Sequence, residues 1–450
     1  MSGLAEQVSE ILERVGDDEV MEIYASVGTE VEVKVYDGRV ESLSRATSGG
    51  LGVRVLGAGV AGSRVGVAWT GSLDGDAIDR AIAEARDNAR YASEDEFMTF
   101  ARPDGVESPG LELTDPSVHS TSLDDKVALA VAAERLVRGD ARIRQVESAD
   151  YSDYDVETVV ASTYGVRAWT RRTGSFLSLE AIASDERGDQ TGWGLQATRG
   201  PVALEPERVA QDAITRATRL LGAVKPPSMR TTVVFSPRST ATLLAIIGTA
   251  LSGDAVVRGR SIFAGRLGAQ VASREVSVLD DPTDARHFGA SRYDAEGLAC
   301  RRNVLIDQGR LAGFVYDTVS ARRAATVSTG SAVRGGVAGY PSAGCRALAL
   351  AAGTGDADTI VRAVGDGVYV DSLSGVHSGV NPISGDFSVG FTGFMIRGGE
   401  LAEPLREATV ASTLQRMLLD VVAVGSDVEW LPGIAAGQTI AIAGVSVGGR

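Results

Sequence analysis

The residues best suited to chemistry gather in one stretch, residues 375–390, which reads Gly-Val-His-Ser-Gly-Val-Asn-Pro-Ile-Ser-Gly-Asp-Phe-Ser-Val-Gly. It places His377 among hydroxyl, amide and carboxylate side chains, between apolar runs. Glycine and asparagine tolerate positive φ angles, and glycine allows a ligand to approach the backbone closely. The residues alone fit two interpretations equally: a structural array of turns, or a loop at a peptide groove or relic active site.

Other patterns of catalytic residues are sparse. The three histidines, His119, His287 and His377, lie far apart in the sequence. No H-E-x-x-H zinc motif can be written, and no G-x-S-x-G elbow marks a serine nucleophile. Cys300 or Cys345 would need a histidine neighbour and a lowered pKa to act as a nucleophile, so we expect both to be small structural residues.

Two further clusters resemble binding motifs but lack the neighbouring elements or the spacing that those motifs need. Residues 57–62, Gly-Ala-Gly-Val-Ala-Gly, match G-x-G-x-x-G, but a strand pattern rather than a helix follows them. Without a helix N-terminus to face a pyrophosphate, the segment is predicted to be a hairpin turn. Asp150, Asp153 and Asp155 lack the spacing of an EF-hand loop, so we expect a solvated turn or strand edge there.

The overall charge argues against several classes of partner. The chain has 44 basic and 59 acidic side chains, which gives a formal charge of −15. Nucleic acids and anionic membrane surfaces bind clustered cations, so we expect neither as a partner. Two cysteines make no disulfide framework, and residues 1–15 are too polar for a secretory leader. Because no apolar run reaches the ~18 residues of a membrane-spanning helix, a cytoplasmic location is predicted.

Helices and short strands must position these residues. Strict alternation of Val with charged residues over 31–35, followed by Asp37-Gly38, predicts a type I′ hairpin. Apolar residues at helical spacing predict helices near 76–91, 123–138 and 207–221. Separate strands are predicted in the middle of the chain at 142–149, 155–163, 165–171 and 174–183.

Proline-rich stretches divide the chain into predicted domains. Prolines between 101 and 120 indicate one linker, and Pro226-Pro227 marks a second boundary. The predicted domains are an N-terminal α+β domain (1–105), a middle α+β domain (116–223) and a sheet-rich C-terminal domain (229–450). The predicted fold class is therefore α+β, with antiparallel strands in the first two segments. Ser236-Pro237 provides the N-cap and first residue of a helix in the third.

Several sequence blocks resemble the TldD/PmbA family. Residues 381–388, Asn-Pro-Ile-Ser-Gly-Asp-Phe-Ser, are similar to the family's N-x-x-[ST]-G-[DE]-[FY]-S block. The other similar blocks are 393–401 with Pro404 and Thr409, Gly425-Ser-Asp427, and 49–55 with Gly66 and Thr70. The resemblance covers nearly the whole chain and is strongest from about Thr231 to Glu429.

The resemblance also assigns the chain to one branch of that family. The TldD-like subunit is similar to a zinc metallopeptidase, with H-E-x-x-x-H on a helix of the C-terminal domain and a later cysteine ligand. On the register set by Gly253-Asp254, the histidine positions hold Leu244 and Thr249, and the glutamate position holds Ala245. Leucine and alanine offer zinc no donor atom, and a lone threonine hydroxyl is a poor ligand. No cysteine follows Cys345, so the pattern resembles the PmbA (TldE)-like branch, which lacks the zinc motif.

That branch implies a non-catalytic subunit of a TldD/TldE-type zinc-dependent peptidase acting on unfolded or linear peptides. It implies no cofactor in this chain, zinc in a TldD-like partner subunit of a heterodimer, and an extended peptide as substrate. No catalytic or metal-binding residue is assigned to this chain. The candidate residues for a substrate groove are Gly379, Asn381, Gly385, Asp386 and Ser388.

Two other functions stay open. A metal-independent homodimer that binds peptides or regulates another protein would need no peptidase partner. An independent hydrolase would use His377 with Asp386 or a nearby serine, although no recognisable nucleophile supports it.

Overall fold

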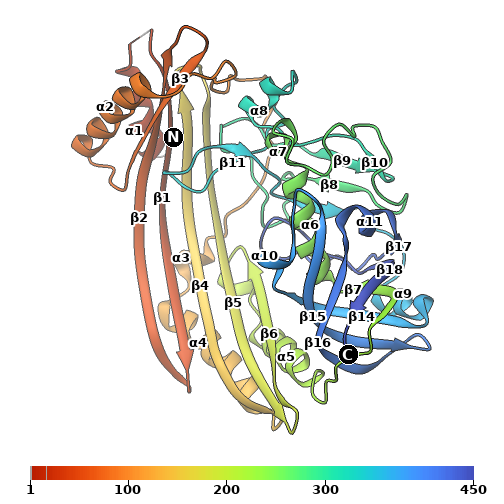
Figure 1. Cartoon of the computed structure of the whole chain (residues 1–450). Helices are drawn as coiled ribbons and strands as arrows, with labels where there is room; N and C mark the ends of the chain where they lie inside the picture. The colour runs from red at the N-terminus through yellow and green to blue at the C-terminus, as the bar shows by residue number, and fades with distance from the viewer. Residues whose placement is uncertain (1–2, 17) are drawn as a thin grey trace.

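The computed structural model, which describes residues 3–16 and 18–450, contains a long six-stranded antiparallel sheet (Figure 1). Its strand order is β3-β2-β1-β4-β5-β6. The strands are β1 (Val20–Tyr36), β2 (Arg39–Ala58), β3 (Ser63–Thr70), β4 (Ile143–Ser162), β5 (Arg167–Asp185) and β6 (Gly188–Thr198). Because β1 pairs with β4 along most of its length, the strands of the first two segments form one continuous sheet.

Tight turns connect the first three strands. Asp37 and Gly38 have φ angles of 54° and 70° and join β1 to β2, so the predicted two-residue hairpin is confirmed. Residues 57–62 lie at the second hairpin, between β2 and β3, where the Gly59 N–H donates to the Gly62 carbonyl at 2.9 Å. The prediction of a hairpin rather than a dinucleotide loop is therefore also confirmed.

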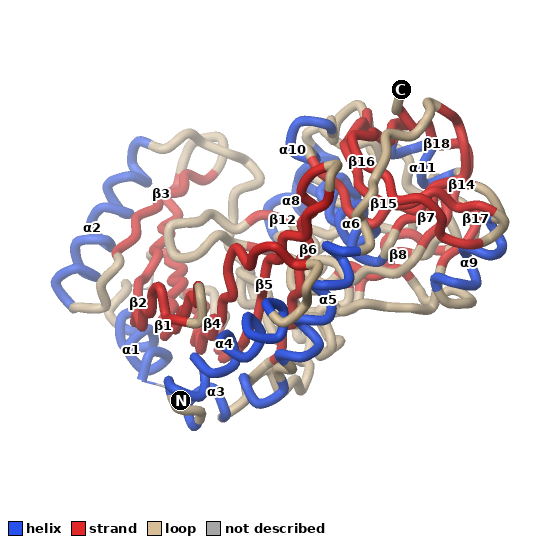
Figure 2. Tube along the Cα trace, turned by 90° about the horizontal axis from the view of Figure 1, so that it is seen from below, coloured by secondary structure: helices blue, strands red, loops and turns tan. Residues whose placement is uncertain are grey.

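Helices pack against one face of the sheet, and the C-terminal region packs against the other (Figure 2). Consecutive residues of a strand face opposite sides. On β4, Val159 packs into the helix-covered core, whereas Val160 packs against Leu298 of the C-terminal region. The helices of the first two segments are α1 (Gly3–Glu13), α2 (Gly75–Tyr91), α3 (Ser117–Ser120), α4 (Leu123–Arg138) and α5 (Pro206–Thr218), with a 3₁₀ turn at Pro201–Ala203.

The middle strands are longer than predicted. The two strands predicted at 142–149 and 155–163 are one strand, β4, and those at 165–171 and 174–183 are one strand, β5. The residues that suggested a turn between the first two, including Asp153 and Asp155, continue the ladder with β1 and β5. Ion pairs of Asp153 with Lys126 and of Asp155 with Arg171 explain why these polar residues do not break the strand.

The C-terminal region contains a second six-stranded sheet, in the order β16-β15-β14-β7-β18-β17. An additional pairing of β16 with β18 closes five of these strands into a ring. The six strands of this sheet are β7 (Met229–Phe235), β14 (Gly367–Ser374), β15 (Asp386–Arg397), β16 (Glu400–Thr413), β17 (Val421–Val424) and β18 (Ile440–Gly448), and β17 lies outside the ring. Mixed helix and strand content with antiparallel sheets confirms the predicted α+β class.

Shorter elements surround this ring. The small strands are β8 (Val278–Asp280), β9 (Asn303–Asp307), β10 (Arg310–Leu311), β11 (Ala332–Val333), β12 (Ser342–Ala343) and β13 (Leu348–Leu350). The helices are α6 (Pro237–Ala250), α7 (Gly253–Val257), α8 (Thr318–Arg323), α9 (Ala357–Val364), α10 (Val376–Gly379) and α11 (Leu414–Leu419). Across the described residues, every helix is too short or too polar to cross a lipid bilayer.

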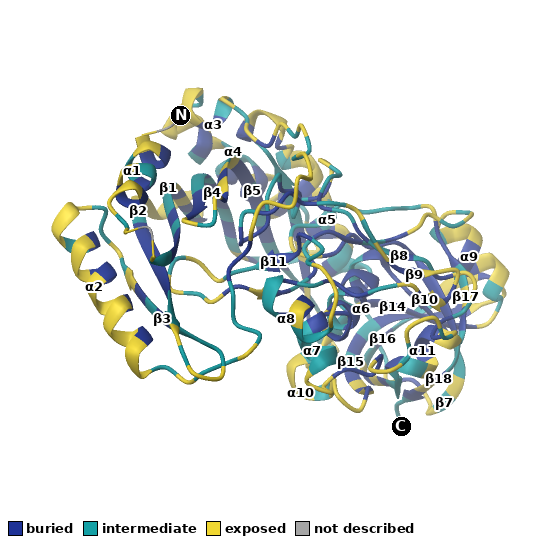
Figure 3. Cartoon of the chain, turned by 90° about the horizontal axis from the view of Figure 1, so that it is seen from above, coloured by how far each residue is buried: buried dark blue, intermediate teal, exposed yellow. Residues whose placement is uncertain are grey.

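Helix α6 is fixed at its start and along one face. The Ser236 hydroxyl accepts a hydrogen bond from the Ser239 N–H at 3.2 Å, as predicted for an N-cap before Pro237. Leu243 and Ile247, four residues apart, are buried in the main core of the C-terminal region. Figure 3 shows burial over the whole chain, with buried residues between the layers and exposed residues on the outer side of α2.

Candidate functional site

The predicted loop lies between β14 and β15 and is held by its own hydrogen bonds. Gly375 adopts φ of 70° and starts the short helix α10. The Asn381 side chain accepts from the N–H groups of Ile383 and Ser384 at 3.0 and 3.2 Å, which forms an Asx turn. The Gly385 N–H then donates to the Asn381 carbonyl at 2.8 Å, so the loop is closed by backbone contacts.

Four of the five predicted groove residues line one open depression of about 570 Å³. Gly379 and Asn381 form one side, and Asp386 and Ser388 at the start of β15 form another. Ala411 and Ser412 of β16, which sequence reasoning missed, complete the lining because β16 pairs with β15. The depression is therefore built from two segments that are about twenty residues apart in the chain.

Gly385, the fifth predicted residue, shapes the loop without lining the depression. Its φ is 85°, and a Cβ atom there would lie 2.1 Å from Oε1 of Gln415. The Gln415 side-chain amide donates to the Ser384 carbonyl at 3.0 Å, which ties the loop to α11. Only glycine satisfies both the backbone angle and the close approach.

The depression has binding groups but no catalytic arrangement. His377 is exposed, and among the described residues no hydrogen bond joins its ring to Asp386 or to a serine. The Asp386 carboxylate instead accepts from the Ser384 hydroxyl at 2.6 Å. A nucleophile needs a base within hydrogen-bond reach, so the geometry gives no support to the hydrolase hypothesis. The exposed Asp386 and Ser388 side chains are suited to hydrogen bonding with a ligand.

The positions compared with zinc ligands lie on α6 and do not fit a metal. Leu244 is buried in the core, and Ala245 is half-buried. Thr249 is exposed, and its hydroxyl donates to the Ile246 carbonyl at 2.7 Å. Among the residues that the structure describes, no three His, Cys, Asp or Glu side chains come together as a metal site.

The two cysteines are buried, as expected for structural residues. Burial raises the pKa of the Cys300 thiol to about 12 and that of Cys345 well above its usual value. The Cys345 thiol donates to the Gly248 carbonyl at 3.7 Å, which places it against α6. At neutral pH both thiols stay protonated and are poor nucleophiles.

The acidic cluster is not in the solvated turn or strand edge that we expected, because it lies on β4, an inner strand of the sheet. Asp153 is 3% exposed and pairs with the buried Lys126 of α4 at 2.6 Å. Asp155 is 7% exposed and pairs with Arg171 and with His119, each at 2.6 Å. Lys126 and Arg171 are cations from other elements of the fold, and their pairing allows the two carboxylates to be buried in the sheet.

Sequence reasoning also missed a layer of buried charges between the first sheet and the C-terminal region. Glu22 of β1 forms an ion pair with Arg54 of β2 at 2.6 Å and with Arg334 at 2.7 Å. All three side chains are at most 2% exposed. Although Glu22 is buried, the two guanidinium groups hold the pKa of its carboxyl below the usual value. Because Glu22 and Arg334 are 312 residues apart, no local pattern identifies this pair.

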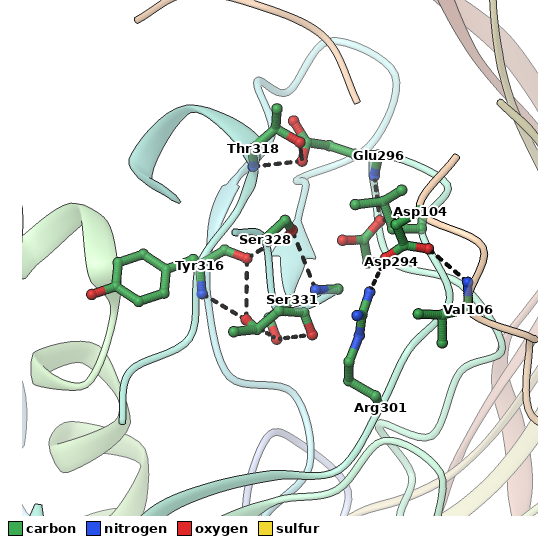
Figure 4. Close-up of polar contacts among 12 residues, drawn as sticks. Asp104, Val106, Asp294, Glu296, Arg301, Tyr316, Thr318, Ser328 and Ser331 are labelled. Carbon is green, nitrogen blue, oxygen red and sulfur yellow. Dashed lines mark hydrogen bonds and ion pairs between the residues drawn. The ribbon is translucent and has the colours of Figure 1, made fainter. Parts of the chain in front are cut away.

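Two buried carboxyl groups lie next to this layer (Figure 4). Asp294 accepts three backbone hydrogen bonds, from Glu296, Leu298 and Ala332 at 2.9–3.0 Å. Glu296 accepts from the N–H and hydroxyl of Thr318 at 2.9 and 2.6 Å with one oxygen, while its other oxygen has no partner within the described part of the chain. Burial raises the pKa of both carboxyl groups, and the Asp294 carboxylate raises the pKa of Glu296 further.

Nearby, Arg301 of the C-terminal region contacts the proline-containing linker at residues 101–120 (Figure 4). Its guanidinium pairs with Asp104 at 2.5 Å, and Asp104 also accepts from the Val106 N–H at 3.1 Å. The proline-containing linker is thus attached to the C-terminal region by a specific contact.

Comparison with known proteins adds relatives of similar length. The chain is 28% identical over 443 residues to metalloprotease PmbA of Escherichia coli O157:H7, with 97% of this chain and 94% of the relative covered. A crystal structure from Thermotoga maritima, described as a putative modulator of a DNA gyrase, has a TM-score of 0.90 and 22% identity, covering 99% of this chain and 100% of that one. TldE from Thermococcus kodakarensis has a TM-score of 0.87 and 22% identity, covering 98% and 100%.

Family comparison covers most of the sequence. Three domains described as PmbA/TldA metallopeptidase domain 1, central domain and C-terminal domain match residues 21–89, 116–221 and 228–449. These matches account for more than half of the chain and include the loop, α6 and both sheets. The chain therefore belongs to the TldD/PmbA family.

Proposed function

We propose that this chain is the non-catalytic, TldE-like subunit of a TldD/TldE-type zinc-dependent peptidase that acts on unfolded or linear peptides. The observation that carries the proposal is the chemistry of α6. Leu244, Ala245 and Thr249 occupy the positions compared with the zinc ligands and the general base, and none of them can replace those residues. Family membership supports the relation to a peptidase, and the zinc is assigned to a TldD-like partner subunit in the cytoplasm.

The role proposed for this chain is to hold part of the extended peptide. The depression around the loop exposes the Asp386 carboxylate and the Ser388 hydroxyl beside the rigid turn of Asn381. At the depression, β15 pairs with β16 on one side, and on the other side the loop itself covers its edge through the Val380–Phe387 bridge and the Asn381 N–H to Asp386 carbonyl bond. The loop would therefore have to move before a peptide could add to β15 as a further strand. The peptide would instead contact side chains and loop backbone, as in other surface grooves.

The partner is tested by affinity capture of the tagged chain from the lysate of its own organism, with partners identified and counted by mass spectrometry. The proposal expects a stoichiometric TldD-like chain that carries H-E-x-x-x-H. Recovery of this chain only as a homodimer would contradict the proposal and favour the metal-independent peptide-binding protein.

The groove is tested in the resulting complex with an unstructured fluorogenic peptide. Asp386→Asn and Ser388→Ala should each raise KM about three- to tenfold, because a net hydrogen bond is worth about 0.5–1.5 kcal/mol. Ser44→Ala, which also replaces an exposed serine on a strand, is the matched control and should leave KM unchanged. Unchanged KM in both groove variants would show that the peptide binds elsewhere.

A further inference from the structure

A second cavity, of about 420 Å³, lies between the first sheet and the C-terminal region. Strands β4 and β5 provide one wall, which includes Tyr154 and Arg172. Segments of the C-terminal region provide the other wall, which includes Phe288, Arg334 and Arg346. The volume is in the range of small-molecule and cofactor sites, and the cavity shares no residue with the depression at the loop.

The cavity is positively charged, although the whole chain carries a formal charge of −15. Three arginines, Arg172, Arg334 and Arg346, line it together with one carboxylate, Asp294. Asp294 already accepts three backbone hydrogen bonds. Among the described residues, neither Arg172 nor Arg346 forms an ion pair. Arg346 lies within electrostatic reach of the buried Asp294 and Asp280, and Arg172 is exposed, so both guanidinium groups keep donors free for a ligand.

Two buried arginine N–H groups without acceptors in the described part of the chain also favour an anionic ligand in the cavity. The Nε–H groups of Arg334 and Arg346 are buried and have no acceptor among the residues that the structure describes. The Arg334 side chain is only 2% exposed and uses one terminal nitrogen for Glu22. Arg346 uses one terminal nitrogen for the Ala332 carbonyl at 3.0 Å. A buried donor without an acceptor is costly, so a bound anion would relieve that cost.

The remaining wall is aromatic and apolar. Tyr24 lies beneath Arg334, with 4.5 Å from the guanidinium carbon to the ring centre, and Tyr154 lies 6.0 Å from the guanidinium carbon of Arg172. Phe288 also lines the cavity. Val160 and Ala168 add aliphatic surface. An inorganic ion would leave this apolar wall unused, whereas an organic acid would contact both the guanidinium groups and the rings.

We propose that this cavity binds the carboxylate of a peptide, with an adjacent apolar side chain against the aromatic wall. The inference rests on the proposed function, which supplies an extended peptide as ligand. The carboxylate is either the C-terminus of the peptide or an Asp or Glu side chain within it. Arginine is suited to both sources because its planar guanidinium presents paired donors to two carboxylate oxygens.

The test is isothermal titration calorimetry of the full chain with three synthetic hexapeptides. The first is Ala₅-Phe as the free acid, the second is its C-terminal amide, and the third is that amide with Glu at the fifth position. We expect at least one carboxylate peptide to bind at least tenfold more tightly than the uncharged amide. Preference for the first peptide identifies the C-terminus, and preference for the third identifies an acidic side chain. Equal affinity of all three would overturn the proposal, as would binding by none of them.

Variants then assign the binding to the cavity. Arg346→Gln and Arg172→Gln should each weaken binding of the preferred peptide about tenfold and leave the amide unaffected. The Arg172 side chain makes no hydrogen bond to the described residues, so Arg172→Gln should fold and keeps the test valid if Arg346→Gln does not. Arg208→Gln, on the exposed side of α5, is the matched control. Retained affinity in Arg172→Gln, with discrimination against the amide intact, would place the site elsewhere and contradict the proposal.

The two proposals fail separately. If a TldD-like partner is captured but the chain does not discriminate carboxylate from amide, the cavity is not the site and the subunit role stands. If discrimination is seen but no such partner is captured, the carboxylate site stands and the peptidase-subunit role fails.

Discussion

Glu22 is a single carboxylate that forms ion pairs with two buried arginines from different parts of the chain. Glu22→Gln removes that charge and leaves Arg54 and Arg334 buried without an anion. Breaking a buried ion pair in this way costs about 3–5 kcal/mol, so we expect the free energy of unfolding to fall by about that amount. Urea denaturation followed by circular dichroism measures the change.

The matched control is Glu41→Gln, because Glu41 forms an ion pair of similar length, 2.7 Å, with Lys34 at the surface. Both side chains of that pair are more than 40% exposed, so its loss should change stability by less than about 1 kcal/mol. Equal effects of the two variants would mean that burial does not determine the strength of the Glu22 interaction.

Glu296 should make stability depend on pH in the opposite sense from an ordinary paired carboxylate. Burial, followed by repulsion from Asp294, raises the pKa of Glu296 to about 8, from 4.5. Between these values the native state retains a proton that the unfolded chain has released. Stability therefore decreases as pH rises from about 5 to about 8.

Glu296→Gln keeps an acceptor for Thr318 and removes the titration, so its melting temperature should vary less over that pH range than that of the parent chain. Scanning calorimetry at several pH values measures this, with Glu84→Gln on the exposed face of α2 as control. A parallel pH dependence in parent and Glu296→Gln would show that Glu296 is ionised throughout.

At the scale of elements, local signals predicted the helices well. The predicted helix at 123–138 coincides with α4, because its apolar spacing is regular and Ser122 accepts from the Asp125 N–H as its N-cap. The strands of the middle segment were predicted too short. Asp153 and Asp155 resemble turn residues in the sequence, and only their pairing with Lys126, Arg171 and His119 allows them inside β4. Those partners are visible only in the folded chain.

The sequence also predicted only part of the candidate site. The glycine and asparagine content of residues 375–390 identified the loop, and four of its five chosen residues meet at one depression. Ala411 and Ser412 were missed because strand register, not sequence proximity, brings them to the loop. The cavity between the sheet and the C-terminal region was missed entirely, since its arginines lie in separate segments with no shared motif.

The loop element itself gives a prediction about glycine. Gly375 and Gly385 both have positive φ, 70° and 85°, and replacing either by alanine costs about 1–2 kcal/mol of backbone strain. At Gly385 the added Cβ would also meet Gln415 at 2.1 Å, whereas at Gly375 the nearest atom is 4.0 Å away. Because the end of the flexible Gln415 side chain can move away, the two variants should lose similar stability. Gly385→Ala would displace the Gln415 contact with the Ser384 carbonyl and should raise the KM of the complex, while Gly375→Ala should leave KM unchanged. Denaturation and peptide kinetics on both variants measure this, and equal KM values would contradict a shaping role for Gly385.

At the scale of the whole molecule, ion pairs hold the C-terminal region on the first sheet and its linker. Arg334 pairs with Glu22, Arg301 pairs with Asp104, and Arg323 pairs with Asp95. The first of these pairs is buried, whereas the side chains of the other two are between a quarter and a third exposed. Because charged pairs gain strength as water is excluded, Arg334 should contribute most to the coupling between the two parts.

Arg334→Gln tests that coupling, since it leaves the Glu22–Arg54 pair of the sheet intact and removes only the charge that comes from the C-terminal region. We expect the calorimetric unfolding transition to broaden or separate, because the first sheet and the C-terminal region each retain their own core while their interface is weakened. Arg301→Gln, which breaks a more exposed pair, should broaden the transition less. A transition as sharp in Arg334→Gln as in the parent chain would mean that apolar packing between the layers, such as Val160 against Leu298, couples them without the buried charges.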